Sequence, residues 1–206
     1  MTERVVRFGL LVCLVLAGHP TFHASAVESG GRAVAFAGAT RSGKSTLAAL
    51  ACGLGAALVT DSVLRVGRQG SCFAGPGELR LRPPADSLGA GPAVLESGPC
   101  PDGRLAVRYR RVGAEEVDLA AIVVPVLDAR VADLDMELLR GARSAAALVA
   151  HMRHWFCQDR VLVELHMRQL AAVAEKVPVW RCAVPVSPPL HPGYVDTLLR
   201  RVGLAL

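Results

Sequence analysis

The chain has 206 residues, of which 52% are hydrophobic, 20% charged and only 4% aromatic. This length is typical of one domain, and so high a hydrophobic fraction excludes general intrinsic disorder. The sequence has no repeat, heptad run or apolar stretch that could span a bilayer, which excludes coiled-coil and polytopic membrane proteins. The net charge of +5 comes from basic residues that are scattered and not interleaved with aromatics, so we expect no nucleic-acid partner.

Residues 1–21 form an N-terminal apolar segment that resembles a secretory signal in outline. An apolar run covers residues 8–18, and Ala24–Ala26 has the small-residue pattern of a signal-peptidase site. The run is too short to cross a bilayer, and His19 and Pro20 interrupt the approach to the cleavage site. We therefore expect a cytoplasmic protein with reduced cysteines and no stable membrane insertion, and secretion is the alternative.

A phosphate-binding loop is the most informative motif. Residues 33–37 are a short apolar run with strand character, and residues 47–54 are an Ala/Leu-rich run that predicts a helix ending at Gly55. Between them lies a full GxxxxGK[ST] pattern, a predicted nucleotide-binding segment made of Gly38, Ala39, Thr40, Arg41, Ser42, Gly43, Lys44, Ser45 and Thr46. Strand, Gly-rich loop and helix follow in the order that this motif requires.

Each part of the motif has a physical task. Gly38 and Gly43 allow a close backbone approach that a Cβ would block. The loop amides and the positive end of the helix face the phosphates. Lys44 supplies a compact charge to the β- and γ-phosphates, and the Ser45 hydroxyl is a magnesium ligand.

Two carboxylates compete for the second part of the site. Residues 56–60 predict a strand that ends in Asp61, 17 residues after Lys44. A carboxylate there can hold Mg²⁺ or orient an attacking hydroxyl, although a solvated strand end is the simpler interpretation. Asp128 closes the apolar run 120–127 in the manner of a Walker B strand, but Pro125 indicates an edge strand or bulge, so Asp128 ranks below Asp61.

From Phe22 to Val66 the sequence resembles the catalytic domain of HPr kinase/phosphorylase, a bacterial serine kinase related in fold to ATP-dependent phosphoenolpyruvate carboxykinase. His23 stands 15 residues before Gly38, which is the spacing of the family's His-Gly strand. The resemblance implies ATP and Mg²⁺ as ligands, with the metal held by Ser45 and Asp61. It also implies catalytic roles for Asp61, Lys44 and His23, the last as a hydrogen-bond donor to the transferring phosphoryl group.

The chain departs from the family at Ser62, which replaces the second Asp of an acid pair that includes the general base. Either Asp61 or another acid has taken that role, or the protein binds nucleotide without efficient transfer. The resemblance thus implies an ATP-dependent kinase acting on a serine of a small protein or peptide, with a nucleotide-binding regulatory module as the alternative. Smaller relatives beside modified-peptide gene clusters, some of which phosphorylate a peptide, are a better parallel than the enzymes acting on HPr. HPr kinases are hexameric, so the resemblance allows a homo-oligomer.

The remaining chain predicts an alternation of strands and helices. Residues 67–118 are a variable, loop-rich insertion with strand-like pieces at 78–82 and 105–111, suited to a lid or to a surface segment without a task. Further strands are predicted at 119–127 and 177–184, and helices at 144–156, 160–176 and 192–202. We expect residues 22–206 to be a single α/β domain, a P-loop-containing HPr-kinase-like mixed sheet flanked by helices.

Overall fold

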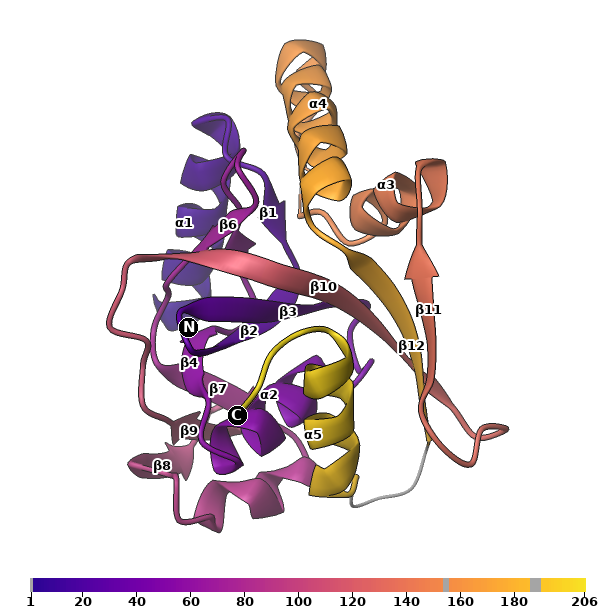
Figure 1. Ribbon diagram of the computed structural model, residues 1–206. Helices are drawn as coiled ribbons and strands as arrows, with labels where there is room; N and C mark the ends of the chain where they lie inside the picture. Colours follow the sequence, from indigo (N-terminus) through magenta and orange to yellow (C-terminus); the bar gives the residue numbers. More distant parts are fainter. Residues whose placement is uncertain (1, 154–155, 186–189) are drawn as a thin grey trace.

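A mixed sheet of seven strands forms the centre of the molecule. The computed structural model describes residues 2–153, 156–185 and 190–206. The sheet has the order β11–β12–β10–β3–β2–β4, and β6 pairs with the start of β10 (Figure 1). Its strands are β2 (Ala24–Ser29), β3 (Arg32–Ala37), β4 (Ala57–Thr60), β6 (Ser71–Phe73), β10 (Glu116–Asp128), β11 (Asp135–Leu139) and β12 (Val179–Pro185). The expected α/β architecture, a mixed sheet flanked by helices, is confirmed at this level.

Both faces of the sheet are covered, so its central strands are apolar on both sides. The covering helices are α2 (Lys44–Gly53) and α5 (Pro192–Arg201) on one face and α3 (Ala142–Val149) and α4 (Arg160–Lys176) on the other. Side chains of β3 alternate between the two cores: Val34 and Phe36 belong to the core with α2, and Ala33 and Ala35 to the core with α4. This alternation explains why the strand before the Gly-rich loop is an unbroken apolar run.

Strand direction brings three chain segments to one edge of the sheet. Strand β2 is antiparallel to both β3 and β4, so β3 and β4 run the same way, and β10 is parallel to β3. Their carboxyl ends therefore meet at one edge. The Gly-rich loop, Asp61 and the end of β10 are all located there.

The segment 67–118 is more regular than its composition indicates. Strands β7 (Glu78–Leu81), β8 (Glu96–Pro99) and β9 (Leu105–Arg108) form a small antiparallel sheet in the order β7–β9–β8, with a 3-10 helix η1 at Ala85–Ala90. The strand-like pieces predicted at 78–82 and 105–111 are confirmed as β7 and β9. Strand β8 was not predicted, because Ser97–Pro99 reads as a turn. Leu79, Leu81 and Val107 extend the core beneath α2.

The predicted helices at 160–176 and 192–202 are confirmed, but the one at 144–156 is wrong over its second half. Helix α3 ends at Val149, and the chain then pairs with the two-residue strand β1 (Thr21–Phe22), which also pairs with β5 (Leu64–Arg65). His23 N donates to His151 O, and Arg153 N donates to Thr21 O. These hydrogen bonds replace those of a helix, so the apolar spacing of about 3.6 residues wrongly predicted a helix beyond Val149. Trp155, near the end of the predicted helix, lies outside the described residues.

Helix α1 (Thr2–Leu16) covers part of the predicted apolar segment and lies beside β1 (Figure 1). Leu11 and Val15 are buried, whereas Phe8, Leu10 and Leu16 are exposed. Within the described ranges, no helix has the length and apolar character needed to cross a bilayer.

Pro125 marks neither an edge strand nor a bulge, which corrects the prediction: β10 lies between β12 and β3, and its register shift is between Leu119 and Ala121. Pro125 lies in the interior of β10 and is in register with Cys182 of β12. Pairing with β3 stops at Val123, and Ile122 N donates toward β12. Because successive N–H groups alternate in direction, the nitrogen of Pro125 faces the side where β3 has already ended. The missing N–H of Pro125 therefore removes no hydrogen bond between strands, and its ring lies beside Gly38.

Candidate functional site

The loop between β3 and α2 is tightly folded. A Cβ at Gly38 would lie 2.5 Å from Ser42 Oγ, and Arg41 and Gly43 have left-handed backbone angles, with φ of 68° and 89°. Ser42 Oγ is buried and has no hydrogen-bond partner among the described residues. No side chain caps the start of α2, and no acidic residue stands in its first turn. The loop and helix thus present uncompensated donors, which favour an anion.

Lys44 begins α2 and is nearly buried, with 6% of its surface exposed. Its Nζ donates to Ala39 O at 2.6 Å. Burial lowers the pKa of Lys44 from its usual value near 10.5 to about 8; the Asp61 carboxylate opposes this shift and the Arg153 guanidinium adds to it. A cation in so low a dielectric gains more from an approaching anion than one in water would.

Asp61 follows β4 directly and is 7% exposed. Its Oδ1 accepts hydrogen bonds from Ser25 Oγ at 2.5 Å and Ser45 Oγ at 3.0 Å. Its Oδ2 accepts longer bonds, both 3.3 Å, from Ser62 Oγ and Arg80 N. The predicted pair of Ser45 and Asp61 is therefore adjacent, and the carboxylate is fixed by four donors from four separate segments.

His23 lies at the junction of β1 and β2, next to this network. Burial, together with the nearby positive charges of Lys44 and Arg153, lowers the pKa of His23 to about 3. The imidazole is therefore neutral at physiological pH. Its backbone links the loop to the far side of the site, because Gly38 N donates to His23 O at 3.3 Å while His23 N bonds to His151 O.

A cavity of about 620 Å³ opens over these groups, a volume within the usual range for small-molecule sites. Of the nine predicted loop residues, six line it: Thr40, Arg41, Gly43, Lys44, Ser45 and Thr46. Gly38, Ala39 and Ser42 lie behind them. Asp61 is the single carboxylate among the described lining residues, against Arg41, Lys44, Arg80, Arg82 and Arg104. Leu127 and the residues at 83–85 add apolar wall.

Asp128 is not part of this cavity. Its carboxylate accepts three hydrogen bonds from Arg130, through the backbone N, Nε and Nη2. These bonds hold the pKa of Asp128 well below its usual range. The structure thus brings Asp61, and not Asp128, together with the loop.

Four groups near the site were missed by sequence reasoning. Ser25, Arg80 and Arg104 reach it from β2 and the small sheet, and Arg153 reaches it from the turn after α3. Only Ser25 had a usable signal, since it stands two positions after His23, just inside a strand. The three arginines are positioned by long-range contacts, which a chain with many arginines does not reveal.

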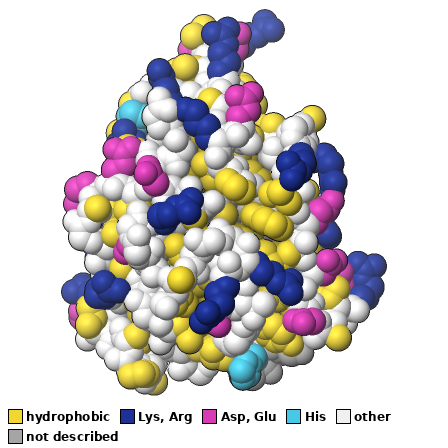
Figure 2. Space-filling view, viewed as in Figure 1, with side chains coloured by type: hydrophobic (Ala, Val, Ile, Leu, Met, Phe, Trp, Pro, Cys, Tyr) yellow, Lys and Arg dark blue, Asp and Glu magenta, His cyan; other side chains and the backbone are white. Residues whose placement is uncertain are grey.

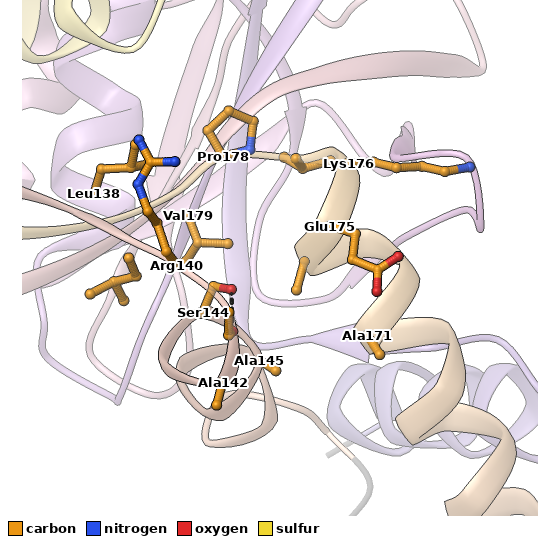
Figure 3. Close-up of a pocket in the computed structure, with 14 residues that line it drawn as sticks. Leu138, Arg140, Ala142, Ser144, Ala145, Ala171, Glu175, Lys176, Pro178 and Val179 are labelled. Atoms are coloured by element: carbon orange, nitrogen blue, oxygen red, sulfur yellow. Dashed lines mark hydrogen bonds between the residues drawn. The ribbon is translucent and has the colours of Figure 1, made fainter.

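A separate hollow of about 500 Å³, away from the Gly-rich loop, lies between β11, α3, α4 and the start of β12 (Figure 3). Lys176 extends away from it and donates to Gln69 Oε1, while Ser144 Oγ donates to the backbone oxygen of Gly141. The remaining wall is mostly aliphatic, so no set of polar groups converges there. On the face shown in Figure 2, basic side chains are dispersed among acidic and apolar ones and form no continuous patch.

No protein-family model matches the chain, and no curated protein is significantly similar to it.

Proposed function

We propose that the chain binds ATP with Mg²⁺ at residues 38–46 and transfers the γ-phosphoryl group to a serine hydroxyl of a small protein or peptide, on a P-loop fold of the HPr-kinase type. One observation carries the proposal: the Asp61 carboxylate lies 3.0 Å from the hydroxyl of Ser45, immediately after the buried Lys44. A lysine, a hydroxyl and a carboxylate at one helix N-terminus are the groups that phosphoryl transfer requires. ATP as the donor also implies the cytoplasm.

The local chemistry fits both ligands. Ser42 Oγ is a buried polar atom without a partner among the described residues, and the space at Gly38 would be filled by any Cβ. Ser45 Oγ and Asp61 Oδ1 are hard oxygen donors of the kind that Mg²⁺ selects. The described residues contain no cluster of three His, Cys, Asp or Glu that could hold a metal alone, so phosphate oxygens and water would complete the shell. Bound there, Mg²⁺ would offset the charge of the phosphates.

The two oxygens of Asp61 can have different roles in the proposed reaction. Oδ1 is committed to Ser25 and Ser45, whereas Oδ2 has only two long hydrogen bonds and borders Ser62. In the proposed step the serine oxygen attacks the γ-phosphorus, and the bond to the β,γ-bridging oxygen breaks with its electron pair leaving on ADP. The hydroxyl proton passes to Asp61 Oδ2.

Positive charge would stabilise the transferring group. Lys44 and Arg153 lie close enough to lower the pKa of His23, and Asp61 is the single carboxylate among the described residues that line the cavity at Lys44. Neutral His23 can donate one ring N–H without adding charge. Since phosphoryl transfer depends mainly on positioning and charge stabilisation, these groups are suited to it.

A second candidate function is a regulatory module that binds nucleotide without transferring phosphate. Ser62 favours it, because a serine cannot accept the acceptor's proton at neutral pH without its own base. The four hydrogen bonds to Asp61 favour it too, since they engage both carboxylate oxygens before an acceptor hydroxyl arrives.

Transfer to a library of serine-containing peptides from γ-labelled ATP separates the two functions. We expect Ser62→Asp to raise transfer at least about tenfold, since a general base contributes ~10²–10⁴ in rate. Ser62 has φ of 74°, a conformation that Asp adopts more readily than most residues. Asp61→Asn should abolish transfer, and Ser62→Ala is the matched control. If the wild type labels a peptide and neither Ser62→Asp nor Asp61→Asn alters the labelling, the assignment of this acid pair is wrong. If no peptide is labelled, the regulatory module remains.

A further inference from the structure

A second cavity, of about 760 Å³, meets the first at Asp61. Both cavities are lined by His23, Thr40, Asp61, Ser62, Arg80 and Arg104. Arg41 and residues 43–46 line only the first, whereas α1 and the segment 73–76 line only the second. Two compartments that share one carboxylate are the arrangement that a two-substrate transfer needs, because donor and acceptor must meet at the reacting atom.

The walls of the second cavity differ in chemistry from those of the first. One wall is apolar and comes from α1, through Phe8, Leu10, Leu11 and Leu14. Phe8 and Leu10 are exposed at 47% and 57%, so part of this apolar surface is open to a ligand. The ring of Phe8 also packs edge-on against Phe156, with centroids 5.7 Å apart, which ties this end of α1 to the turn before α4.

Other residues that line the second cavity are basic. The guanidinium of Arg65 stacks on Phe73 at 3.8 Å, and its buried Nε has no hydrogen-bond partner among the described residues. Arg153 is partly buried, and burial lowers its pKa. The acid at this rim, Glu115, is engaged by two hydrogen bonds from Arg111 Nη2. An apolar wall together with Arg65 and Arg153, whose neighbour Glu115 is already engaged by Arg111, fits a ligand that is apolar on one side and acidic on the other.

We infer that the second cavity is the acceptor site, and that its substrate is a peptide segment in which the serine is flanked by an apolar residue and an acidic one. The apolar side chain would pack on Leu10 and Leu14, and the acidic one would pair with Arg65 or Arg153. The serine hydroxyl would then enter at Ser62 and meet the γ-phosphate over Asp61. This inference rests on the proposed kinase function.

A positional-scanning library tests the inference without a known substrate. Each peptide has a fixed serine, and the neighbouring positions are set in turn to each residue type. With MgATP and the full-length chain, we expect acidic and aliphatic neighbours to be labelled about tenfold better than Lys, which corresponds to ~1.4 kcal/mol. Arg65→Gln should remove most of the acidic preference, and Leu14→Asn most of the aliphatic one, through KM and not through kcat.

Matched controls come from the same elements. Arg68→Gln and Leu16→Asn change exposed side chains that line neither cavity, and they should leave both preferences unchanged. MgATP affinity should be the same in all four variants, since none of the four residues lines the first cavity. Labelling that is indifferent to the neighbours, or preferences that survive both Arg65→Gln and Leu14→Asn, overturns this inference and leaves the kinase function standing. Bound MgATP with no labelling of any peptide overturns both.

Discussion

Asp61 is held by four donors that come from β2, the start of α2, its own neighbour and β7. Hydrogen bonds to a charged group contribute about 1.5–3 kcal/mol each, so the orientation of this carboxylate is well defined before any ligand arrives. Lys44 is in the opposite situation, because it is nearly buried and its Nζ donates only to a backbone carbonyl among the described residues. The site thus combines one satisfied anion with one under-compensated cation.

Gly38 is the residue whose substitution tests the loop geometry most cleanly. In Gly38→Ala the new Cβ would meet Ser42 Oγ at 2.5 Å, so we expect MgATP binding to weaken at least about tenfold, or ~1.4 kcal/mol. Gly38→Ala combined with Ser42→Gly removes the obstructing atom and should recover most of the affinity. Gly53→Ala is the control, because nothing lies within 4 Å of a Cβ there. Equal binding by Gly38→Ala and wild type would contradict this geometry.

Replacing Lys44 should stabilise the fold while removing its function. Below pH 8 the lysine is protonated in both the folded and the unfolded chain, and only the folded chain bears the desolvation cost. Lys44→Met should therefore raise the free energy of unfolding by about 1–3 kcal/mol at pH 7.

Between pH 8 and 10.5 the folded chain has released this proton while the unfolded chain retains it, so wild-type stability rises relative to the variant. Urea titrations of both chains at pH 7, 8, 9 and 10 should show the difference narrowing. A difference that stays constant across this range would show that Lys44 is not desolvated.

At the scale of elements, β2 is the strand on which the site depends most. Ala24, Ala26 and Val27 are fully buried, and β2 pairs with β3 on one side and β4 on the other. The apparent signal-peptidase site at Ala24–Ala26 is therefore the first half of a central strand.

A chain that begins at Val27 loses β1, half of β2 and the hydrogen bond from Ser25 to Asp61. We expect it to lack cooperative thermal unfolding by circular dichroism, since β2 lies between β3 and β4 and is hydrogen-bonded to both. A sharp transition near that of the full-length chain would contradict the role assigned to this strand.

The sequence predicted those helices and strands whose formation depends mainly on residues close together in the chain. The loop motif, the apolar strand before it and the helix at 160–176, which Asp159 caps, are all encoded within a few residues. The errors arise where contacts with distant segments decide the structure. Residues 151–153 bond to the segment at β1 and therefore leave the helix, and Pro125 fits inside β10 because pairing with β3 ends at Val123. In the site, Lys44, Ser45 and Asp61 could be predicted from spacing. The arginines at 65, 80, 104 and 153 could not, because only the folded sheet brings them together.

For the whole molecule, the central feature is one sheet edge that serves two cavities. The strands β3 and β4 run in the same direction and deliver the loop and Asp61 to this edge, while α1 and the small sheet β7–β9–β8 build walls on either side. Lining charges are mostly positive, which suits a polyphosphate in one cavity and an acidic peptide in the other.

The most direct test is a calorimetric titration of the full-length chain with MgATP, which needs no knowledge of the acceptor. We expect micromolar binding by the wild type that is lost in Lys44→Ala and lost again when magnesium is left out. Circular dichroism of each sample would establish that the chain is folded. Absence of binding by a folded wild type, or equal binding by Lys44→Ala, would contradict the assignment of residues 38–46 as a nucleotide site.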